Sequence, residues 1–207
     1  MKGDSLDLTR GQLLALALVV EGGLGALAVV LGLFFGLPVG EWFKIGWLEV
    51  GMGVVGTMAL FGLLILAWRF PVGPWGRLMR YAENILQPLF RSCRGMDLLV
   101  VAILAGVGEE LFFRGLVQGW LARWWGDWPA LVTAGVLFGL AHCATREYVV
   151  LATSMGLLFG WSVLATGNLA AAIIAHAGYD YLALRLLVRG RLGKAEELRS
   201  GKLPSRP

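Results

Sequence analysis

Six long apolar runs are the feature that most limits what this chain can fold into. A helix needs about 20 apolar residues to cross the hydrocarbon core of a bilayer. The runs cover residues 11–36, 48–68, 97–125, 129–143, 148–166 and 168–188. Overall 57% of the residues are hydrophobic and 15% are charged, whereas soluble domains have about 45–50% and about 25%. We therefore expect an all-α, polytopic transmembrane bundle of about six spans.

The segment between the second and third runs has a different pattern. In residues 74–90, "PWGRLMRYAENILQPLF", apolar side chains recur every three or four positions, and charged and amide side chains such as Gln87 fill the other face. This periodicity predicts an amphipathic helix lying in the membrane interface. A polar-faced connector packed on the bundle is the alternative. We divide the chain into residues 1–96 (two spans and this helix), 97–190 (a four-span bundle) and 191–207 (a basic tail).

The basic residues predict the orientation of the chain. With six spans, one side of the membrane holds both termini and fifteen basic residues, and the other side holds only Lys44 and Arg123. The remaining one of the eighteen basic residues, Arg114, lies within a span. Basic loops favour the cytoplasm. We expect a multi-pass protein of the inner (plasma) membrane with both termini cytoplasmic. The net charge of +4 then needs no nucleic-acid partner, and the bilayer is the first expected partner.

The third span carries three charges in "GVGEELFFRG", residues 106–115. An ionisable residue at bilayer depth is costly, by about 2.5–3.5 kcal/mol on insertion scales, and usually faces a bundle interior or a cavity. Glu110 and Arg114 are spaced i,i+4, which predicts an ion pair on one helix face. Glu109 points about 100° away on the same helix, so it is left free to face the bundle. The expected roles are structural for Glu110 and Arg114, and reactive for Glu109.

Both histidines of the chain also fall in predicted spans. His142 ends the fourth run, four residues after Phe138, and His176 lies in the sixth run, four residues before Asp180. At a rise of about 1.5 Å per residue, Glu109 and His176 lie about 18 Å from the inner face and His142 about 10 Å. One shared layer is therefore feasible, and Asp180 is expected to orient His176 by accepting a ring N–H.

Two routes to hydrolysis fit this set. A free carboxylate and a histidine can activate a water as general base, and a second histidine with a short polar partner can donate hydrogen bonds to the developing oxyanion. Alternatively Glu109, His142 and His176 are the candidate ligands of a Zn²⁺ ion with one open position for water. The residues leave the two routes equally open, and both predict hydrolysis of an acyl bond, most plausibly a peptide bond. Neither an H-E-x-x-H nor a G-x-S-x-G motif occurs.

Three motifs together resemble those of the CPBP family, also called the CAAX-protease and bacteriocin-processing or ABI family. They are Glu109-Glu110-x3-Arg114, Phe138-x3-His142 and His176-x3-Asp180. The resemblance covers roughly residues 97–188. It implies an intramembrane endopeptidase with Glu109, His142, His176 and Asp180 as the catalytic core, and Glu110, Arg114 and Phe138 in support. Its substrate would be a membrane-associated or lipidated protein or peptide.

Two other classes of function stay open. One is a non-catalytic membrane scaffold or immunity protein that keeps the fold without turnover. The other is a proton or metal-ion transporter that uses the same polar set as a relay. A transporter is expected to spread its polar residues along a path, whereas here they gather in one layer.

Overall fold

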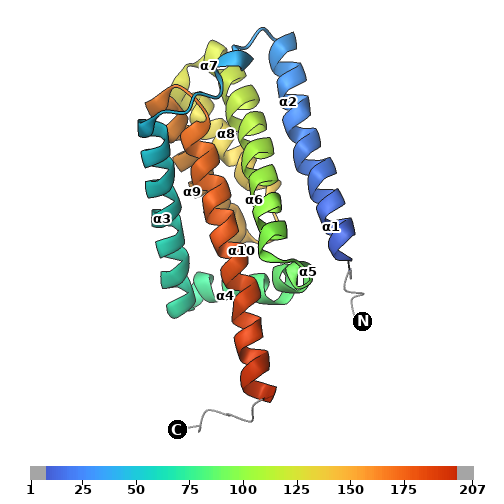
Figure 1. The fold of residues 1–207 in the computed structure, drawn as a ribbon. Coiled ribbons are helices and arrows are strands. Elements are labelled where there is room, and N and C mark those ends of the chain that lie inside the picture. Colours follow the sequence, from blue (N-terminus) through green and yellow to red (C-terminus); the bar gives the residue numbers. More distant parts are fainter. Residues whose placement is uncertain (1–7, 200–207) are drawn as a thin grey trace.

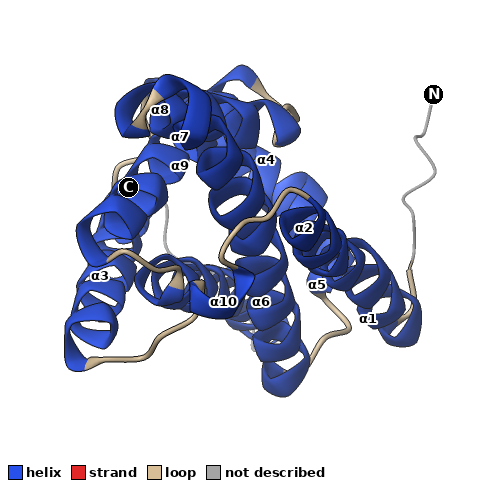
Figure 2. Ribbon diagram, turned by 90° about the horizontal axis from the view of Figure 1, so that it is seen from above, coloured by secondary structure: helices blue, strands red, loops and turns tan. Residues whose placement is uncertain are grey.

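A computed structural model describes residues 8–199, with side chains as far as Arg189. Within this part every regular element is a helix and no strand occurs, which confirms the all-α expectation. The long helices run roughly side by side as a bundle (Figure 1). Seen from above, α10 (Ala170–Arg199) lies between α3 (Trp47–Arg69) and α6 (Gly95–Glu110), as Figure 2 shows. The C-terminal helix is therefore central, and its side chains meet both neighbours.

Each predicted apolar run is helical. The first run is one continuous helix made of three segments, and so is the third. The elements are α1 (Arg10–Ala17), η1 (Leu18–Gly22) and α2 (Gly23–Phe34), then η2 (Val39–Glu41) and α3, then α6, η4 (Leu111–Gln118) and α7 (Gly119–Trp125), then α8 (Asp127–Ala141), α9 (Arg146–Thr166) and α10. The segments η1 and η4 are π-helical turns, which occur frequently at functional sites.

Among the described residues, four helices are long and apolar enough to cross a membrane by length and composition. They are Arg10–Phe34, Trp47–Arg69, Arg146–Thr166 and Ala170–Arg189. Helix α8 is apolar but shorter. The helix from α6 to α7 is long, but it contains the charges of residues 109, 110 and 114. The six-span topology therefore stays a prediction for these two helices.

The amphipathic segment forms α4 (Gly73–Tyr81), η3 (Ala82–Leu86) and α5 (Gln87–Phe90), and it lies across one end of the bundle (Figure 1). Leu78 and Met79 are buried against Ala67 of α3, whereas Ile85 is exposed. The placement of Gln87 on the outer polar face is wrong, because Gln87 is buried and its Nε2 donates to the carbonyl of Leu187 at 2.6 Å. The helix is thus packed on the bundle with only part of its apolar face exposed.

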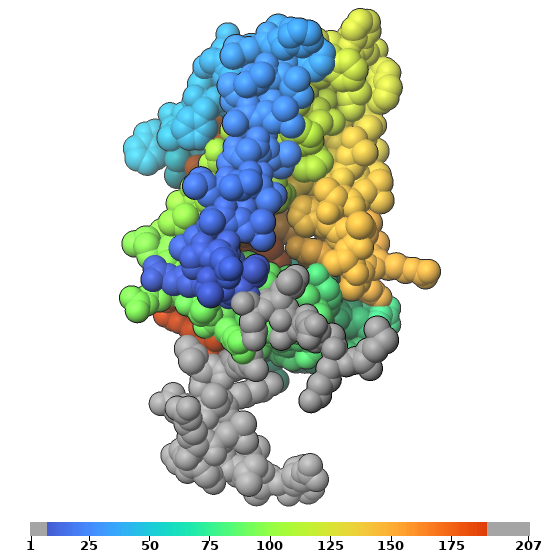
Figure 3. Space-filling model, turned by 90° about the vertical axis from the view of Figure 1, so that its right-hand side faces the viewer, coloured from blue at the N-terminus to red at the C-terminus, as the bar shows by residue number. Residues whose placement is uncertain are grey.

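Glycines allow the helices around the site to approach closely. A Cβ added at Gly156 of α9 would lie 2.9 Å from the carbonyl oxygen of Gly135 of α8. A Cβ at Gly106 of α6 would lie 2.8 Å from the Cβ of Ala177 of α10. Added Cβ atoms at Gly139 and Gly160 would likewise meet Thr153 and Gln118. The glycine pairs Gly135-x3-Gly139 and Gly156-x3-Gly160 are therefore close-packing faces. The surface is hollowed between the blue N-terminal helix and the gold α8–α9 region (Figure 3).

The tail begins later than the sequence suggests. Helix α10 continues to Arg199, whereas the apolar run ends at residue 188. The added segment is rich in Ala, Glu, Leu, Lys and Arg, which are good helix formers. The rest of the predicted basic tail, residues 200–207, lies outside the described residues.

Candidate active site

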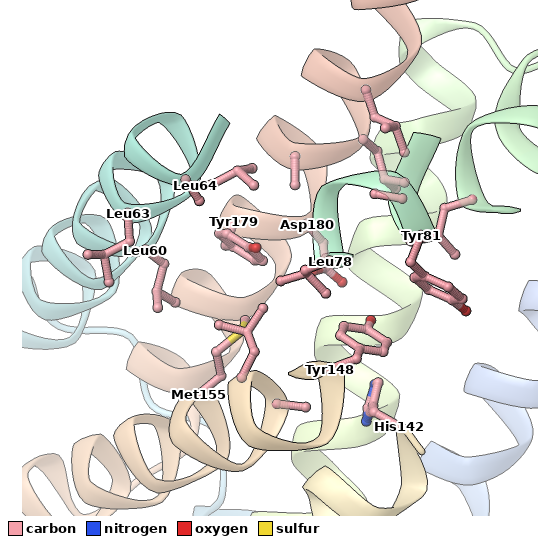
Figure 4. Close-up of a pocket in the computed structure, with 18 of the residues that line it drawn as sticks. Leu60, Leu63, Leu64, Leu78, Tyr81, His142, Tyr148, Met155, Tyr179 and Asp180 are labelled. Carbon is pink, nitrogen blue, oxygen red and sulfur yellow. The ribbon is translucent and has the colours of Figure 1, made fainter. Parts of the chain in front are cut away.

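An apolar cavity of about 330 Å³ lies inside the bundle, near α4 (Figure 4). Glu109, His142, His176 and Asp180 all line it, together with Phe138. The rest of the lining is mostly aliphatic and aromatic, from α3, α4, η3, α5, α6, α9 and α10: Leu60, Leu63, Leu64, Ala67, Trp68, Trp75, Leu78, Met79, Tyr81, Ala82, Leu86, Phe90, Val101, Ala105, Tyr148, Leu151, Ala152, Met155, Tyr179, Ala183, Leu184 and Leu187. The four residues expected at the catalytic core therefore share one cavity.

Glu109 and His142 form a pair in this cavity. The Nε2 of His142 lies 3.7 Å from Oε2 of Glu109. The other ring nitrogen, Nδ1, lies 2.8 Å from the carbonyl oxygen of Phe138. A carbonyl only accepts, so Nδ1 carries the proton and Nε2 turns its lone pair toward Glu109. Oε2 of Glu109 is buried and has no hydrogen-bond partner among the described residues.

The position of His142 depends on where α8 stops. Helix α8 ends at Ala141, and His142 is the residue after it, with φ −100° and ψ 33°. Its backbone N–H donates to the carbonyl of Gly139 at 3.0 Å. The apolar pattern predicted that His142 lies inside a helical span. The structure places it on the turn that leads to α9, where the bond to Phe138 fixes its ring.

Glu110 and Arg114 form the ion pair that their spacing predicts. Nη1 of Arg114 lies 3.1 Å from Oε1 of Glu110, and both side chains are fully buried. Nη2 of Arg114 donates to the carbonyl of Gly156 at 2.9 Å. The guanidinium also lies over the ring of Phe138, 4.3 Å from its centroid, within the range of a cation–π contact. This pair lies behind the cavity wall and connects α6–η4 to α8 and α9.

The partners of His176 differ from the expectation. Its Nδ1 lies 2.8 Å from Oε1 of Glu110, whereas Nε2 lies 3.5 Å from Oδ2 of Asp180. Glu110 therefore holds the ring by the shorter contact, and Asp180 faces the opposite nitrogen at ion-pair distance. The ring is stacked on Phe159, with centroids 5.0 Å apart and an angle of 15° between the planes. Glu110 thus orients a site histidine in addition to pairing with Arg114.

The expected zinc ligands are not gathered around one point. In the part of the chain that the structure describes, no group of three or more His, Cys, Asp or Glu side chains could hold a metal ion. Glu109 and His142 face each other, but both nitrogens of His176 face other carboxylates. A catalytic Zn²⁺ needs three protein ligands at about 2.0–2.2 Å when they are His and carboxylate. The donor set therefore does not fit zinc, and no step below uses a metal.

Three contributions to the site were not predicted from the sequence. They are the ring of Phe159 under His176, the carbonyl of Gly156 that receives Arg114, and Tyr148, whose ring lies edge-on to His142 with centroids 5.6 Å apart. The only signal in the sequence was the position of Tyr148 at the start of the fifth apolar run. Glu21 of η1 packs by its backbone against Gly108 in α6.

The fold and the site together define an all-α membrane bundle with a carboxylate–histidine pair beside an apolar cavity. Residues 94–182 match a family model described as Type II CAAX prenyl endopeptidase Rce1-like. This match is consistent with the resemblance to the CPBP family of intramembrane proteases that the three motifs carry. No curated protein and no solved structure matches the chain.

Proposed function

We propose that this protein is an intramembrane endopeptidase that hydrolyses a peptide bond of a lipidated or membrane-associated protein or peptide. One observation carries the proposal most directly: the partnerless Oε2 of Glu109 faces the lone pair of His142 Nε2 at 3.7 Å, inside an apolar cavity. The Rce1-like domain supports a peptidase. A scaffold or a transporter has no comparable need for this pair.

A water molecule between Glu109 and His142 is the nucleophile in this proposal. Both facing atoms are acceptors, and a separation above 3.5 Å suggests a bridging water. Such a water donates one hydrogen to Oε2 of Glu109 and the other to Nε2 of His142. Its lone pairs then point toward the cavity, where the scissile carbonyl would lie. Glu109 accepts the proton as water adds, so it acts as the general base.

The apolar lining supports a substrate with a hydrocarbon chain. Sites for organic ligands usually have volumes of about 300–1,000 Å³ and mostly apolar walls with a few convergent polar groups. The cavity here fits this description, and Figure 4 shows Leu60, Leu63 and Leu64 on the side of the cavity opposite His142. A lipid attached near the cleavage site would occupy the apolar part and hold the peptide bond near Glu109.

Cleavage of a farnesylated peptide tests this function. The purified protein in lipid vesicles is expected to cut a peptide with a farnesylated cysteine near its C-terminus, with mass spectrometry locating an internal bond. The same peptide with a free cysteine is expected to have a kcat/KM lower by about 100-fold or more, because each buried methylene contributes about 0.8 kcal/mol. Activity is expected to persist after treatment with a zinc chelator.

The opposite outcomes have distinct meanings. Loss of activity on chelation and its return with Zn²⁺ would show that a metal site assembles when substrate binds. Equal cleavage of both peptides would refute the lipid-binding role of the cavity. If the protein cleaves neither of these peptides nor any other membrane peptide, the endopeptidase proposal fails. The scaffold or immunity role and the transporter role then become the candidates.

We also propose that the amphipathic helix and both chain ends face the cytoplasm. In the bundle, the start of α1 and the end of α10 lie at the same end as α4 and α5 (Figure 1), which supports an even number of crossings. Reporter fusions after Arg94 and after Val188 are both expected to report a cytoplasmic location. A periplasmic signal from either fusion would contradict the topology, and fusions after Lys44 serve as the matched periplasmic control.

A further inference from the structure

We propose that the hydroxyl of Tyr148 donates a hydrogen bond to the oxyanion that forms when water adds to the substrate carbonyl. This inference rests on the proposed endopeptidase function and names a further catalytic residue for it. Hydrolysis of a peptide bond passes through a tetrahedral intermediate, and its oxyanion needs donors placed in advance. Among the residues of the three motifs, His176 can supply one donor, because it lines the cavity and its Nε2 makes only a 3.5 Å contact with Asp180. Tyr148 would be a second donor.

The other motif residues offer no free donor in the cavity. Glu109 takes the proton of the water in the proposed step, so it is not a donor to the oxyanion. The N–H of His142 is directed to the carbonyl of Phe138. His176 is held by Glu110 through Nδ1, and its Nε2, 3.5 Å from Asp180, remains as one donor beside the cavity. The guanidinium of Arg114 is fully buried on Glu110 and Gly156 and does not line the cavity.

Tyr148 lies beside the reacting pair. His142 makes ring contacts with Phe138 and Tyr148, and of these two only Tyr148 has a polar hydrogen. The Tyr148 ring lies edge-on to the imidazole and lines the cavity. In Figure 4 its hydroxyl points away from His142 and into the cavity, toward the side of Asp180. A substrate carbonyl group that lies on the cavity side of the water proposed between Glu109 and His142 would therefore have its oxygen near this hydroxyl.

The Tyr148 side chain is held in place, but its hydroxyl is unused. Its backbone N–H donates to Oγ1 of Thr145, the residue that caps α9, at 3.1 Å. Its ring also packs on Tyr81, with centroids 6.0 Å apart. Among the described residues the hydroxyl has no hydrogen-bond partner. A fixed, unpaired donor facing an apolar cavity is suited to a group that appears only with substrate.

The oxygen of the water forms a bond to the carbonyl carbon, its proton passes to Glu109, and the π pair of the carbonyl moves to oxygen. Tyr148 keeps its proton and donates a hydrogen bond to that oxyanion. When the carbonyl re-forms, the bond from carbon to nitrogen breaks, and the leaving amine takes the proton from Glu109.

Tyr148→Phe removes only the hydroxyl and is the test variant. We expect kcat to fall by about 10²–10³, the usual effect of losing one oxyanion donor, with little change in KM. The matched control is Tyr181→Phe, because Tyr181 packs in the core near Leu98 and does not line the cavity. That variant is expected to keep the wild-type kcat. Unchanged kcat in Tyr148→Phe, or an equal loss in both variants, would overturn the proposal.

Binding of two uncleaved peptides separates a catalytic role from a structural one. A phosphonate peptide carries a charged oxygen like the intermediate, whereas a reduced-amide peptide has no oxygen there. In Tyr148→Phe the affinity for the phosphonate is expected to fall by the same factor as kcat/KM, with the reduced amide binding as in wild type. An equal loss for both peptides would mean a structural role and would refute the inference.

The same assay distinguishes failure of this inference from failure of the proposed function. If wild type cleaves, Glu109→Gln does not, and Tyr148→Phe keeps full activity, the endopeptidase stands and the role of Tyr148 falls. If Glu109→Gln cleaves as well as wild type, the proposed function falls and the oxyanion role falls with it.

Discussion

Replacing Glu109 by glutamine is expected to lower the rate of peptide cleavage by about 10²–10⁴ while the protein stays folded and membrane-inserted. Glutamine has nearly the same shape as glutamate, but its amide cannot take a proton from water. The carboxylate oxygen that faces His142 has no other partner, so its loss breaks no structural hydrogen bond. The measurements are kcat on the farnesylated peptide and the thermal unfolding midpoint in detergent.

Removing His142 is expected to have an effect similar to that of removing Glu109. The two groups hold one water, and groups that act as a unit show losses that do not add. The double variant Glu109→Gln/His142→Ala is therefore expected to be about as slow as either single variant. Glu41→Gln, an exposed glutamate paired with Lys44, is the control and should leave kcat unchanged. Near-normal cleavage by Glu109→Gln would contradict the mechanism, and additive losses would contradict the shared water.

Replacing Arg114 by methionine is expected to cost about 3–5 kcal/mol of the free energy of unfolding. The substitution keeps most of the side-chain volume but leaves Glu110 as an uncompensated buried charge. Both side chains of the pair are fully buried, so water cannot take the place of the guanidinium. Denaturant titration in mixed micelles measures the change. Lys44→Met removes a partner from an exposed pair and should have little effect.

The charge-reversed pair Glu110→Arg/Arg114→Glu distinguishes a simple ion pair from a network. From spacing alone, the swap should partly restore the folded protein. The contacts predict no rescue, because an arginine at position 110 would set its donors against Nδ1 of His176. A glutamate at 114 would set its oxygens against the carbonyl of Gly156. Recovery of wild-type stability by the swap would show that these two further contacts contribute little.

Because His176 belongs to the same buried network as Glu110 and Arg114, His176→Ala is expected to lower stability as well as activity. The ring contacts Glu110 at 2.8 Å and stacks on Phe159, so its removal leaves a buried carboxylate oxygen with one donor fewer. Loss of activity in this variant therefore says less about the reaction than loss of activity in Glu109→Gln.

Local regularity explains what the sequence by itself determined. The helical repeat fixes the angle between residues four apart, and this is why the Glu110–Arg114 pair was predictable and is confirmed. The apolar runs predicted the helices, because backbone groups in lipid need partners within their own segment. Residue type and order within the three motifs named the polar residues that line the cavity: Glu109, His142, His176 and Asp180.

Only the tertiary structure decided which of these groups meet. The Glu110–His176 contact joins residues 66 positions apart in sequence, and it depends on how α6 and α10 are rotated about their axes. That rotation follows from close approaches such as Gly106 against Ala177, which periodicity does not reveal. The position of His142 depends on the end of α8 at Ala141. The position of Tyr148 beside His142 depends on the start of α9 at Arg146. Spacing along one helix is a local property, whereas contacts between helices are set by packing across the whole bundle.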